Sequence, residues 1–395
     1  MIAPEPFFEP RGTPFSEFHR IRALTDLGHT VDLVTYPFGE DVSMPGLRVF
    51  RCLRPPFIRH IGIGPSFAKV PLDLALTLTA MRRAMSTRYD VVHSHEEGAA
   101  IGVVLAGLLG VPHLYDMHSS LPQQLTNFKF SRSRILRWCF ERFERVAVGR
   151  SRVVIVICPE LERLVKELRP AQDPVLIENA PGAGEVAPGG DRATIRARYG
   201  LDVRTPLILY TGTFEAYQGL DLLFAAMKDV LRTRPDARLL LAGGRPAQVE
   251  QARRESDALG LGPAVIFAGE RPADEIPALL DAADVLVSPR SRGTNTPLKI
   301  YQYLRSGRVI VATRLLTHTQ VLDDSVSILT PATADGFAAG LLRALDHPDE
   351  TARLGAAAAT LAATKYSYEA YLARTREAVG RLGLAAPAAV SGSAV

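Results

Sequence analysis

Residues 284–313 read DVLVSPRSRGTNTPLKIYQYLRSGRVIVAT, and this stretch decides the fold. A short apolar run, VLVS, leads into a polar loop and then into a segment with helical spacing that ends at Gly307. A second apolar run, VIVAT, follows. A helix between two buried strands is the crossover unit of a parallel sheet, because parallel neighbours cannot be joined by a tight turn. The stretch therefore predicts an α/β domain.

The same alternation of strands and helices occurs in both halves of the chain. Strands are expected at 1–4, 29–37, 47–53, 90–95, 113–118, 153–159, 207–214, 237–244, 264–270 and 284–290, and helices at 16–27, 71–85, 220–231 and 368–382. The run ENAPGAGEVAPGGD (178–191) is rich in Pro and Gly and reads as a linker. We therefore expect domains at 1–181 and 182–366, a helix within 367–384 that packs back on the first domain, and a disordered tail at 385–395.

Composition places the chain among globular proteins. Hydrophobic residues make up 47% and charged residues 22%, which excludes a disordered or fibrous class. A length of 395 residues is too great for one ordinary core. Cys52, Cys139 and Cys158 lack metal or redox spacing, so we expect no zinc site, no disulfide framework and a cytoplasmic location. No signal peptide is evident. The apolar stretches 71–81 and 98–112 are shorter than the ~20 residues of a membrane-spanning helix, and 98–112 reads as a buried helix.

The first strand is short, because only Met1, Ile2 and Ala3 precede the turn. A buried first strand usually has more apolar residues, so we expect the natural chain to begin a few residues upstream.

Positive charge gathers between residues 51 and 88. The basic residues there are Arg51, Arg54, Arg59, Lys69, Arg82, Arg83 and Arg88, against the single acid Asp73, and Phe57, Ile58, Ile61, Ile63 and Phe67 lie among them. Such a segment suits peripheral contact with an anionic membrane, at the inner face of the cytoplasmic membrane. A solvated connection with a few core anchors fits it as well. No aromatic-and-basic binding motif accompanies it, so we expect no nucleic-acid partner.

Two Rossmann-like halves suit a dehydrogenase, a periplasmic-type binding protein or a two-domain glycosyltransferase. The dinucleotide fingerprint G-x-G-x-x-G is missing between the first strand and helix, and the missing signal peptide argues against a periplasmic binder. Six segments, in order, resemble the retaining glycosyltransferases of family 4: PRGTPFSEFHRIRALTDLGHTVDLVT (10–35), DVVHSHEE (90–97), YDMHSSLP (115–122), YTGTFEAYQGLDLL (210–223), LLLAGG (239–244) and SPRSRGTNTPLKIYQYLRSGRVIVAT (288–313). The resemblance runs from about residue 4 to about residue 380. It implies the GT-B fold, in which an acceptor-binding domain (here 1–181) and a donor-nucleotide-binding domain (182–366) face a central cleft.

The resemblance assigns donor phosphate contacts to two turns. After the first strand, Gly12 and Thr13 stand where the family usually has two glycines, and Arg11 is a nearby counter-charge. A turn into a helix N-terminus lets backbone N–H groups approach a phosphate, although a plain strand-to-helix turn would have the same sequence. After the strand at 207–211, the family usually supplies an Arg and a Lys for the diphosphate. This chain instead has the residues Gly212, Thr213, Glu215 and Gln218.

The donor loop departs from the family in a second way. The family brackets this segment with two glutamates, the first contacting the donor sugar and the second gripping the ribose hydroxyls, whereas this chain has Thr294 and Gln302. Glutamine still accepts from one hydroxyl and donates to another, so we expect ribose binding in a weaker form. Lys299, at a helix start that favours anions, is expected to compensate the diphosphate. Further donor contacts are expected from Arg290, Asn295 and Thr296, while Arg290 and Arg292 are also consistent with solvated loop charges.

Catalytic and acceptor groups are expected at the strand ends of the first domain. The resemblance implies that His118 reaches the transferred sugar, and Asp116 precedes it by two residues. A neutral imidazole can hydrogen-bond a sugar hydroxyl and help to hold a cationic transition state. His95, Glu96 and Glu97 follow another strand and are expected to bind acceptor hydroxyls, while His93 is less certain and His113 reads as structural.

The implied reaction transfers a sugar from a UDP- or GDP-sugar to a glycan or lipid-linked saccharide, with retention and without metal or cofactor. The donor half has no D-x-D pair, so we interpret Asp281, Asp323 and Asp324 as structural. Two alternatives stay open: a non-catalytic subunit, given the lost Arg, Lys and Glu, and a sugar-nucleotide epimerase that uses His118 with Glu96 and Glu97. A glycoside hydrolase would need paired carboxylates that the donor loop lacks, and no phosphorylase motif is apparent.

Overall fold

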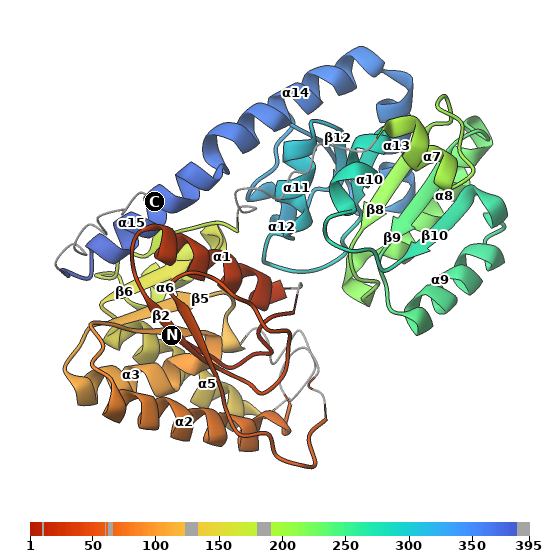
Figure 1. Ribbon diagram of the computed structural model, residues 1–395. Coiled ribbons are helices and arrows are strands. Elements are labelled where there is room, and N and C mark those ends of the chain that lie inside the picture. Colours follow the sequence, from red (N-terminus) through yellow and green to blue (C-terminus); the bar gives the residue numbers. More distant parts are fainter. Residues whose placement is uncertain (10–11, 60, 62–65, 123–132, 180–190, 385–395) are drawn as a thin grey trace, which may run out of the picture. The chain divides into compact units, whose positions relative to one another are not determined.

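The computed structural model describes residues 1–395 apart from 10–11, 60, 62–65, 123–132, 180–190 and 385–395 (Figure 1). The chain forms two compact units. Unit 1 comprises Met1–Asn179 and Glu369–Val395, and unit 2 comprises Ala180–Tyr368. The tail at 385–395 and most of the linker at 178–191 lie outside the described residues, so their expected character is not tested.

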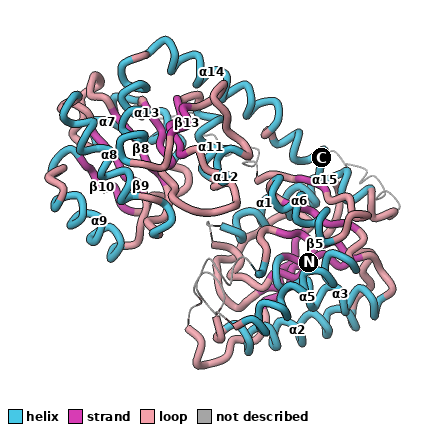
Figure 2. Tube along the Cα trace, turned by 180° about the vertical axis from the view of Figure 1, so that it is seen from behind, coloured by secondary structure: helices cyan, strands magenta, loops and turns pink. Residues whose placement is uncertain are grey.

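Unit 1 is built on a seven-stranded parallel sheet with the order β3-β2-β1-β4-β5-β6-β7. The strands are β1 (Ile2–Ala3), β2 (Val31–Thr35), β3 (Leu47–Arg51), β4 (Val92–His95), β5 (His113–Met117), β6 (Val153–Val156) and β7 (Val175–Leu176). The helices are α1 (Gly12–Asp26), α2 (Lys69–Ser86), η1 (Glu96–Gly98), α3 (Ala99–Leu109), α5 (Arg134–Arg150), α6 (Pro159–Leu168) and α15 (Tyr368–Gly380). Figures 1 and 2 show α2, α3 and α5 side by side on one face of this sheet, away from α1 and α15.

Unit 2 is built on a six-stranded parallel sheet with the order β10-β9-β8-β11-β12-β13. The strands are β8 (Leu207–Thr211), β9 (Arg238–Ala242), β10 (Val265–Gly269), β11 (Val285–Ser288), β12 (Val309–Thr313) and β13 (Ile328–Thr330). The helices are α7 (Arg192–Arg198), η2 (Ala216–Gln218), α8 (Leu220–Thr233), α9 (Pro246–Ala258), η3 (Gly262–Ala264), α10 (Ile276–Ala282), α11 (Lys299–Ser306), α12 (Leu316–Thr319), α13 (Ala334–Asp346) and α14 (Pro348–Lys365). Two parallel sheets flanked by helices confirm the predicted α/β fold.

The strands of unit 2 show why the apolar runs predicted a buried parallel sheet. Every residue of β8, β11 and β12 is buried, and alternate side chains enter two separate cores, one on each face of the sheet. Burial on both faces explains runs such as LILYT, which do not alternate with polar residues. The helix ahead of β12 ends at Gly307, whose φ of 68° is the left-handed conformation that favours glycine.

Two expectations need correction. The first helix begins at Gly12, four residues earlier than predicted, so Gly12 and Thr13 lie in its first turn. The stretch at 98–112 forms α3, but Val104 and Leu108 on this helix are 60% and 72% exposed, so its outer side is not buried. None of the described helices is long and apolar enough to cross a membrane.

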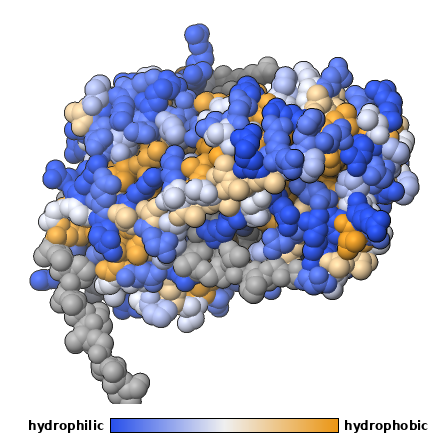
Figure 3. Space-filling view, turned by 90° about the horizontal axis from the view of Figure 1, so that it is seen from above, coloured by the Kyte–Doolittle hydropathy of each residue, from blue (hydrophilic) through white to orange (hydrophobic). Residues whose placement is uncertain are grey.

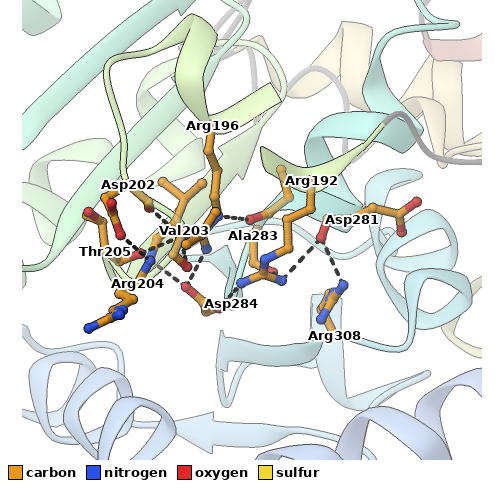
Figure 4. Close-up of polar contacts among 12 residues, drawn as sticks. Arg192, Arg196, Asp202, Val203, Arg204, Thr205, Asp281, Ala283, Asp284 and Arg308 are labelled. Carbon is orange, nitrogen blue, oxygen red and sulfur yellow. Dashed lines mark hydrogen bonds and ion pairs between the residues drawn. The ribbon is translucent and has the colours of Figure 1, made fainter. Parts of the chain in front are cut away.

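A buried arginine fixes α7 against the sheet of unit 2 (Figure 4). Arg196 donates to the carbonyl oxygens of Asp202, Val203 and Thr205 at 2.7–3.1 Å, and its Nη2 lies 2.7 Å from Asp284 Oδ2. Arg192 pairs with the other carboxylate oxygen. These contacts lie at the amino ends of the strands, away from the edge where ligands bind in parallel sheets, so the network stabilises the fold. On the face seen in Figure 3, hydrophilic residues predominate and hydrophobic ones form small groups.

Candidate functional site

The carboxyl ends of β8 and β9 approach each other closely in unit 2. Gly212 follows β8 with a φ of 130°, and its N–H donates to Ala242 O at 2.9 Å. Gly243 follows β9, and a Cβ there would lie 2.0 Å from Gly212 O. Only glycine fits at this second turn, which leaves exposed backbone at the strand ends.

Lys299 is the first residue of α11, and its side chain reaches the end of β8. Its Nζ donates to Thr211 O at 3.1 Å and lies 3.8 Å from the centre of the Tyr210 ring. Burial and the neighbouring Arg290 guanidinium hold the pKa of Lys299 well below its ordinary value. An anion beside Lys299 would raise this pKa again, because the anion supplies the negative charge that the site lacks.

Arg290 is the second cation of this edge. Its Nη1 donates to Asn295 O at 2.8 Å and to Thr317 Oγ1 at 2.9 Å, and its guanidinium lies 4.9 Å from the Tyr217 ring centre. Burial lowers the pKa of Arg290. Within the described part of the chain no carboxylate pairs with Arg290 or Lys299, so two adjacent positive groups lack a protein counter-charge.

Side chains from α12 hold the donor loop in place. Thr317 Oγ1 donates to Asn295 O at 2.6 Å, and Gln320 Nε2 donates to Thr294 O at 2.6 Å. His318 is buried between Ser288 Oγ at 2.8 Å and Thr313 O at 2.8 Å, and burial lowers its pKa to about 3, so it is a neutral structural group. The sequence analysis missed these contacts, because Thr317, His318 and Gln320 carry no motif.

The remaining predicted donor residues of unit 2 lie on the same edge. Gln218 Nε2 is 3.4 Å from Thr213 Oγ1, a long contact. Gln218 Oε1 and Thr296 Oγ1 are buried and find no hydrogen-bond partner among the described residues. Gln302 is half-buried on α11, three residues after Lys299, which is close to one helical turn.

Glu215 is the acid of the phosphate turn that the sequence left unexplained. Its Oε1 accepts from Arg245 Nη2 at 3.1 Å and from Gln248 Nε2 at 3.0 Å. Arg245 therefore compensates the carboxylate, which removes one obstacle to an anion at this edge.

In unit 1, Asp116 joins three elements at the end of β5. It is fully buried, with Oδ2 at 2.8 Å from Arg20 Nε and Oδ1 at 3.1 Å from His118 Nε2. Burial alone would raise the pKa of Asp116, but Arg20 and the nearby histidines lower it well below its ordinary value. An ionised carboxylate beside the imidazole attracts the Nε2 side of the His118 ring. Asp116 therefore orients His118.

The end of the chain supports this arrangement. Arg20 Nη1 donates to Thr375 Oγ1 on α15 at 3.1 Å, and the guanidinium lies 4.9 Å from the Tyr371 ring centre. Thr375 thus helps to fix His118 through Arg20 and Asp116. These contacts could not be predicted from the sequence, because the residues lie far apart along the chain.

The predicted acceptor group follows β4. Glu96 has a φ of 46°, unusual for a residue with a side chain, and its carboxylate accepts from Ser119 Oγ at 2.8 Å. Burial raises the pKa of Glu96 well above its ordinary value. Glu97 pairs with Lys69 of α2. His95 is buried and stacks on His93 with ring centres 4.8 Å apart, and burial holds the pKa of His95 well below its ordinary value.

Three of these groups are close enough to be considered as metal ligands. One ligand atom each of His93, His95 and Asp116 lie within 4.8 Å of one another. However, Arg20 already occupies the carboxylate of Asp116. The positive charge of that guanidinium would repel a cation on the same carboxylate, so the donor set fits an ion poorly.

The other predicted residues do not belong to these clusters. Gly12 is exposed, with a φ of 53°, and Thr13 is half-buried at the start of α1. Arg11 lies outside the described residues. His113, expected to be structural, is held between Ser94 Oγ at 2.7 Å and Ser151 Oγ at 2.8 Å.

Comparisons with known proteins find matches to both halves of the chain. The model described as "Glycosyl transferases group 1" matches residues 191–360, and "Glycosyl transferase 4-like domain" matches residues 19–180. The α-D-kanosaminyltransferase of Streptomyces kanamyceticus is 28% identical over 306 residues, covering 73% of this chain and 76% of that protein. Sucrose-phosphate synthase from Thermosynechococcus elongatus has a similar structure, with a TM-score of 0.78, 20% identity, and 97% and 98% of the two chains covered. HepE from Anabaena in complex with UDP gives a TM-score of 0.74, 16% identity, and coverage of 96% and 99%.

Proposed function

Because the chain belongs to the group 1 glycosyltransferases of family 4, we propose that it moves a sugar from a nucleotide-diphosphate sugar to an acceptor hydroxyl. The proposed transfer proceeds with retention at the anomeric carbon and without a metal. Unit 2 supplies the donor site, and unit 1 supplies the acceptor group and His118. A glycan or a lipid-linked saccharide is the proposed acceptor.

The observation that carries this proposal is the pair Lys299 and Arg290. Both are enclosed basic groups with no carboxylate partner among the described residues, and a positive charge on them is costly in an empty site, which is why the pKa of each is lowered. A diphosphate supplies the missing negative charge, and the N-terminus of α11 adds its dipole. The family's usual Arg and Lys after β8 are thus replaced, in this proposal, by cations from β11 and α11.

The proposed nucleotide base and the contacts to the donor sugar rest on further observations. HepE was crystallised with UDP, which supports a uridine nucleotide here. Gln302, half-buried on α11, is proposed to meet the ribose hydroxyls, and the buried Thr296 hydroxyl lacks a partner among the described residues and suits a sugar or phosphate oxygen. Thr294 and Asn295 are held by α12 and complete the loop.

His118 is proposed to contact the transferred sugar. Its Nε2 lies 3.1 Å from Asp116 Oδ1, and this neighbouring carboxylate would hold the ring in position for a sugar hydroxyl. Glu96 and Glu97, which follow β4, are proposed to bind acceptor hydroxyls. The leaving phosphate is proposed to take the acceptor proton, because no described side chain in unit 2 stands out as a base.

Incubation of the purified protein with radiolabelled UDP-sugars, in EDTA and with a lipid extract as acceptor, tests this function. Label in a lipid or saccharide product supports transfer. An epimerised nucleotide sugar with no acceptor product would favour the epimerase, and an untouched donor for every UDP- and GDP-sugar would favour a non-catalytic subunit. Lys299→Ala should abolish the product, whereas Lys228→Ala, an exposed lysine on α8, should not.

A further inference from the structure

Helix α2 is apolar on two opposite sides. Leu72, Leu76 and Ala80 are buried in the core of unit 1. A second stripe, spaced at three and four residues, is 41–81% exposed and consists of Val70, Leu74, Leu78, Met81 and Met85. At 100° per residue the two stripes lie about 180° apart. One apolar side is enough to hold a helix on a sheet. The second, exposed stripe of α2 is therefore not explained by packing within unit 1 and marks a surface for a partner.

The exposed apolar surface continues over the two neighbouring helices. On α3 it includes Val104 and Leu108, one helical turn apart, and on α5 it includes Ile135 and Trp138, which are 76% and 63% exposed. Figures 1 and 2 show these three helices side by side on one face of the sheet. We name this surface the outer helical face: the exposed side chains of α2, α3 and α5.

Positive charge accompanies the apolar side chains. Helices α2 and α5 together carry eight Arg and Lys residues against three Asp and Glu residues, an excess larger than the net charge of +4 of the whole chain. Arg82 on α2 and Arg142 and Arg145 on α5 are exposed, and none of them forms an ion pair with another described residue. These arginines are available to an anionic partner.

Part of the positive charge between residues 51 and 88 is used within the protein. Lys69 pairs with Glu97, Arg83 pairs with Asp32, and Arg51 donates to backbone carbonyls, so these three are used within the protein. Ile58 is buried and Ile63 lies outside the described residues. Within 51–88 exposed charge remains at Arg59, Arg82 and Arg88, and α5, which the sequence analysis did not consider, adds further exposed arginines such as Arg142 and Arg145.

An apolar hollow lies at the N-terminal end of α2. It has a volume of about 400 Å³ and is lined by Phe57, Ile58, Arg59, Phe67, Ala68 and Pro71. Phe57 and Phe67 are 75% and 81% exposed at its rim. Apolar walls with one arginine suit an acyl chain below a phosphate headgroup.

From these observations we infer that the outer helical face binds the surface of an anionic lipid bilayer, with the apolar stripe of α2 and Trp138 entering the boundary between headgroups and acyl chains. Apolar side chains surrounded by unpaired arginines match that boundary in both polarity and charge. A second copy of the chain would meet the same positive charge, which opposes face-to-face pairing. Lys69 ties the start of α2 to Glu97, so, resting on the proposed function, a lipid-linked acceptor would meet the acceptor group at the membrane surface.

Trp138 provides a direct test, because it is the only tryptophan of the chain. The full-length protein is mixed with phosphatidylcholine vesicles containing phosphatidylglycerol, without donor, and tryptophan emission is recorded. A blue shift of the emission and quenching by brominated lipid are expected. Unchanged emission with all of the protein remaining in the supernatant on sedimentation would overturn the inference, and it would leave the proposed transfer untouched because no donor is present.

Matched variants locate the binding surface. Leu74→Gln/Leu78→Gln should lower the vesicle partition coefficient at least about tenfold, whereas Val203→Gln/Leu259→Gln, two exposed apolar residues of unit 2, should not. Arg142→Gln/Arg145→Gln should remove the preference for phosphatidylglycerol, and Arg204→Gln/Arg376→Gln should keep it. Equal loss in test and control pairs would overturn the inference. So would a wild-type dimer in sedimentation equilibrium that the α2 variant converts to a monomer, with no vesicle binding by either.

Discussion

Replacing Lys299 by Met should weaken nucleotide binding without weakening the fold. Methionine is of similar length and keeps the contact with the Tyr210 ring, but it loses the charge and the hydrogen bond to Thr211 O. A hydrogen bond to a charged group contributes about 1.5–3 kcal/mol, and the ammonium next to a diphosphate stands at the upper end of that range. A loss of about 2–3 kcal/mol corresponds to a UDP affinity about 30- to 150-fold weaker.

The stability of the free protein should change little in the same variant. The lost hydrogen bond is offset by removal of an enclosed amine whose positive charge burial and Arg290 disfavour, so the free energy of unfolding should stay within about 1 kcal/mol of wild type. Isothermal titration with UDP gives the affinity, and urea unfolding gives the stability. Lys228→Met is the matched control. A UDP affinity within about twofold of wild type in Lys299→Met would refute the assignment, because an ammonium on the diphosphate must contribute more.

The same lysine makes UDP binding depend on pH. The pKa of Lys299 is depressed in the free protein and rises when phosphate binds, so wild type should take up a proton on binding UDP. The affinity for UDP should therefore fall as pH rises through the pKa of the free lysine. Titrations in two buffers of different ionisation enthalpy measure this uptake, and a binding heat independent of buffer would contradict it. Gln302→Glu should tighten UDP binding about three- to tenfold, because a carboxylate accepts from both ribose hydroxyls, and unchanged affinity would show that α11 does not meet the ribose. Arg196→Met should destabilise unit 2 by about 3–5 kcal/mol in urea, since it removes the donor of several buried carbonyl oxygens and one of the two arginines that pair with Asp284. Exposed Arg204→Met should cost less than about 0.5 kcal/mol, and equal losses would argue against the network. Burial raises the pKa of Glu144 to about 7, so the folded state favours the protonated carboxyl and loses stability as pH rises from 4.5 toward 7. Glu144→Gln should flatten that dependence. An unchanged pH profile of unfolding would exclude Glu144 as its source.

The fold followed from local patterns. Runs such as LILYT and VIVAT are buried on both faces, and each is followed by a turn and a helix, so period and composition alone predicted two parallel sheets. The sequence pattern placed the start of α1 too late, because Gly12 and Thr13 were assigned to a turn instead of to the helix. Apolar content also predicted that α3 is buried, since sequence cannot tell a core side from an exposed apolar side.

The candidate sites were predictable only in part. Lys299 and Arg290 stood out because they flank a polar loop, and the structure brings them to one strand end. Three-dimensional closure created the rest. Arg20 and Thr375 lie 355 positions apart and meet beside Asp116, and no pattern in the sequence links them. The compensation of Glu215 by Arg245 likewise depends on two turns that only the sheet brings together.

The central claim is that unit 2 holds a nucleotide diphosphate without a metal. The most direct measurement is a thermal-shift series with UDP, GDP, ADP and CMP in the presence of EDTA, because a ligand that binds the folded state raises its midpoint. We expect a higher midpoint with UDP or GDP in wild type and in Lys228→Met, and a much smaller rise in Lys299→Met. An unchanged midpoint with every nucleotide would contradict it.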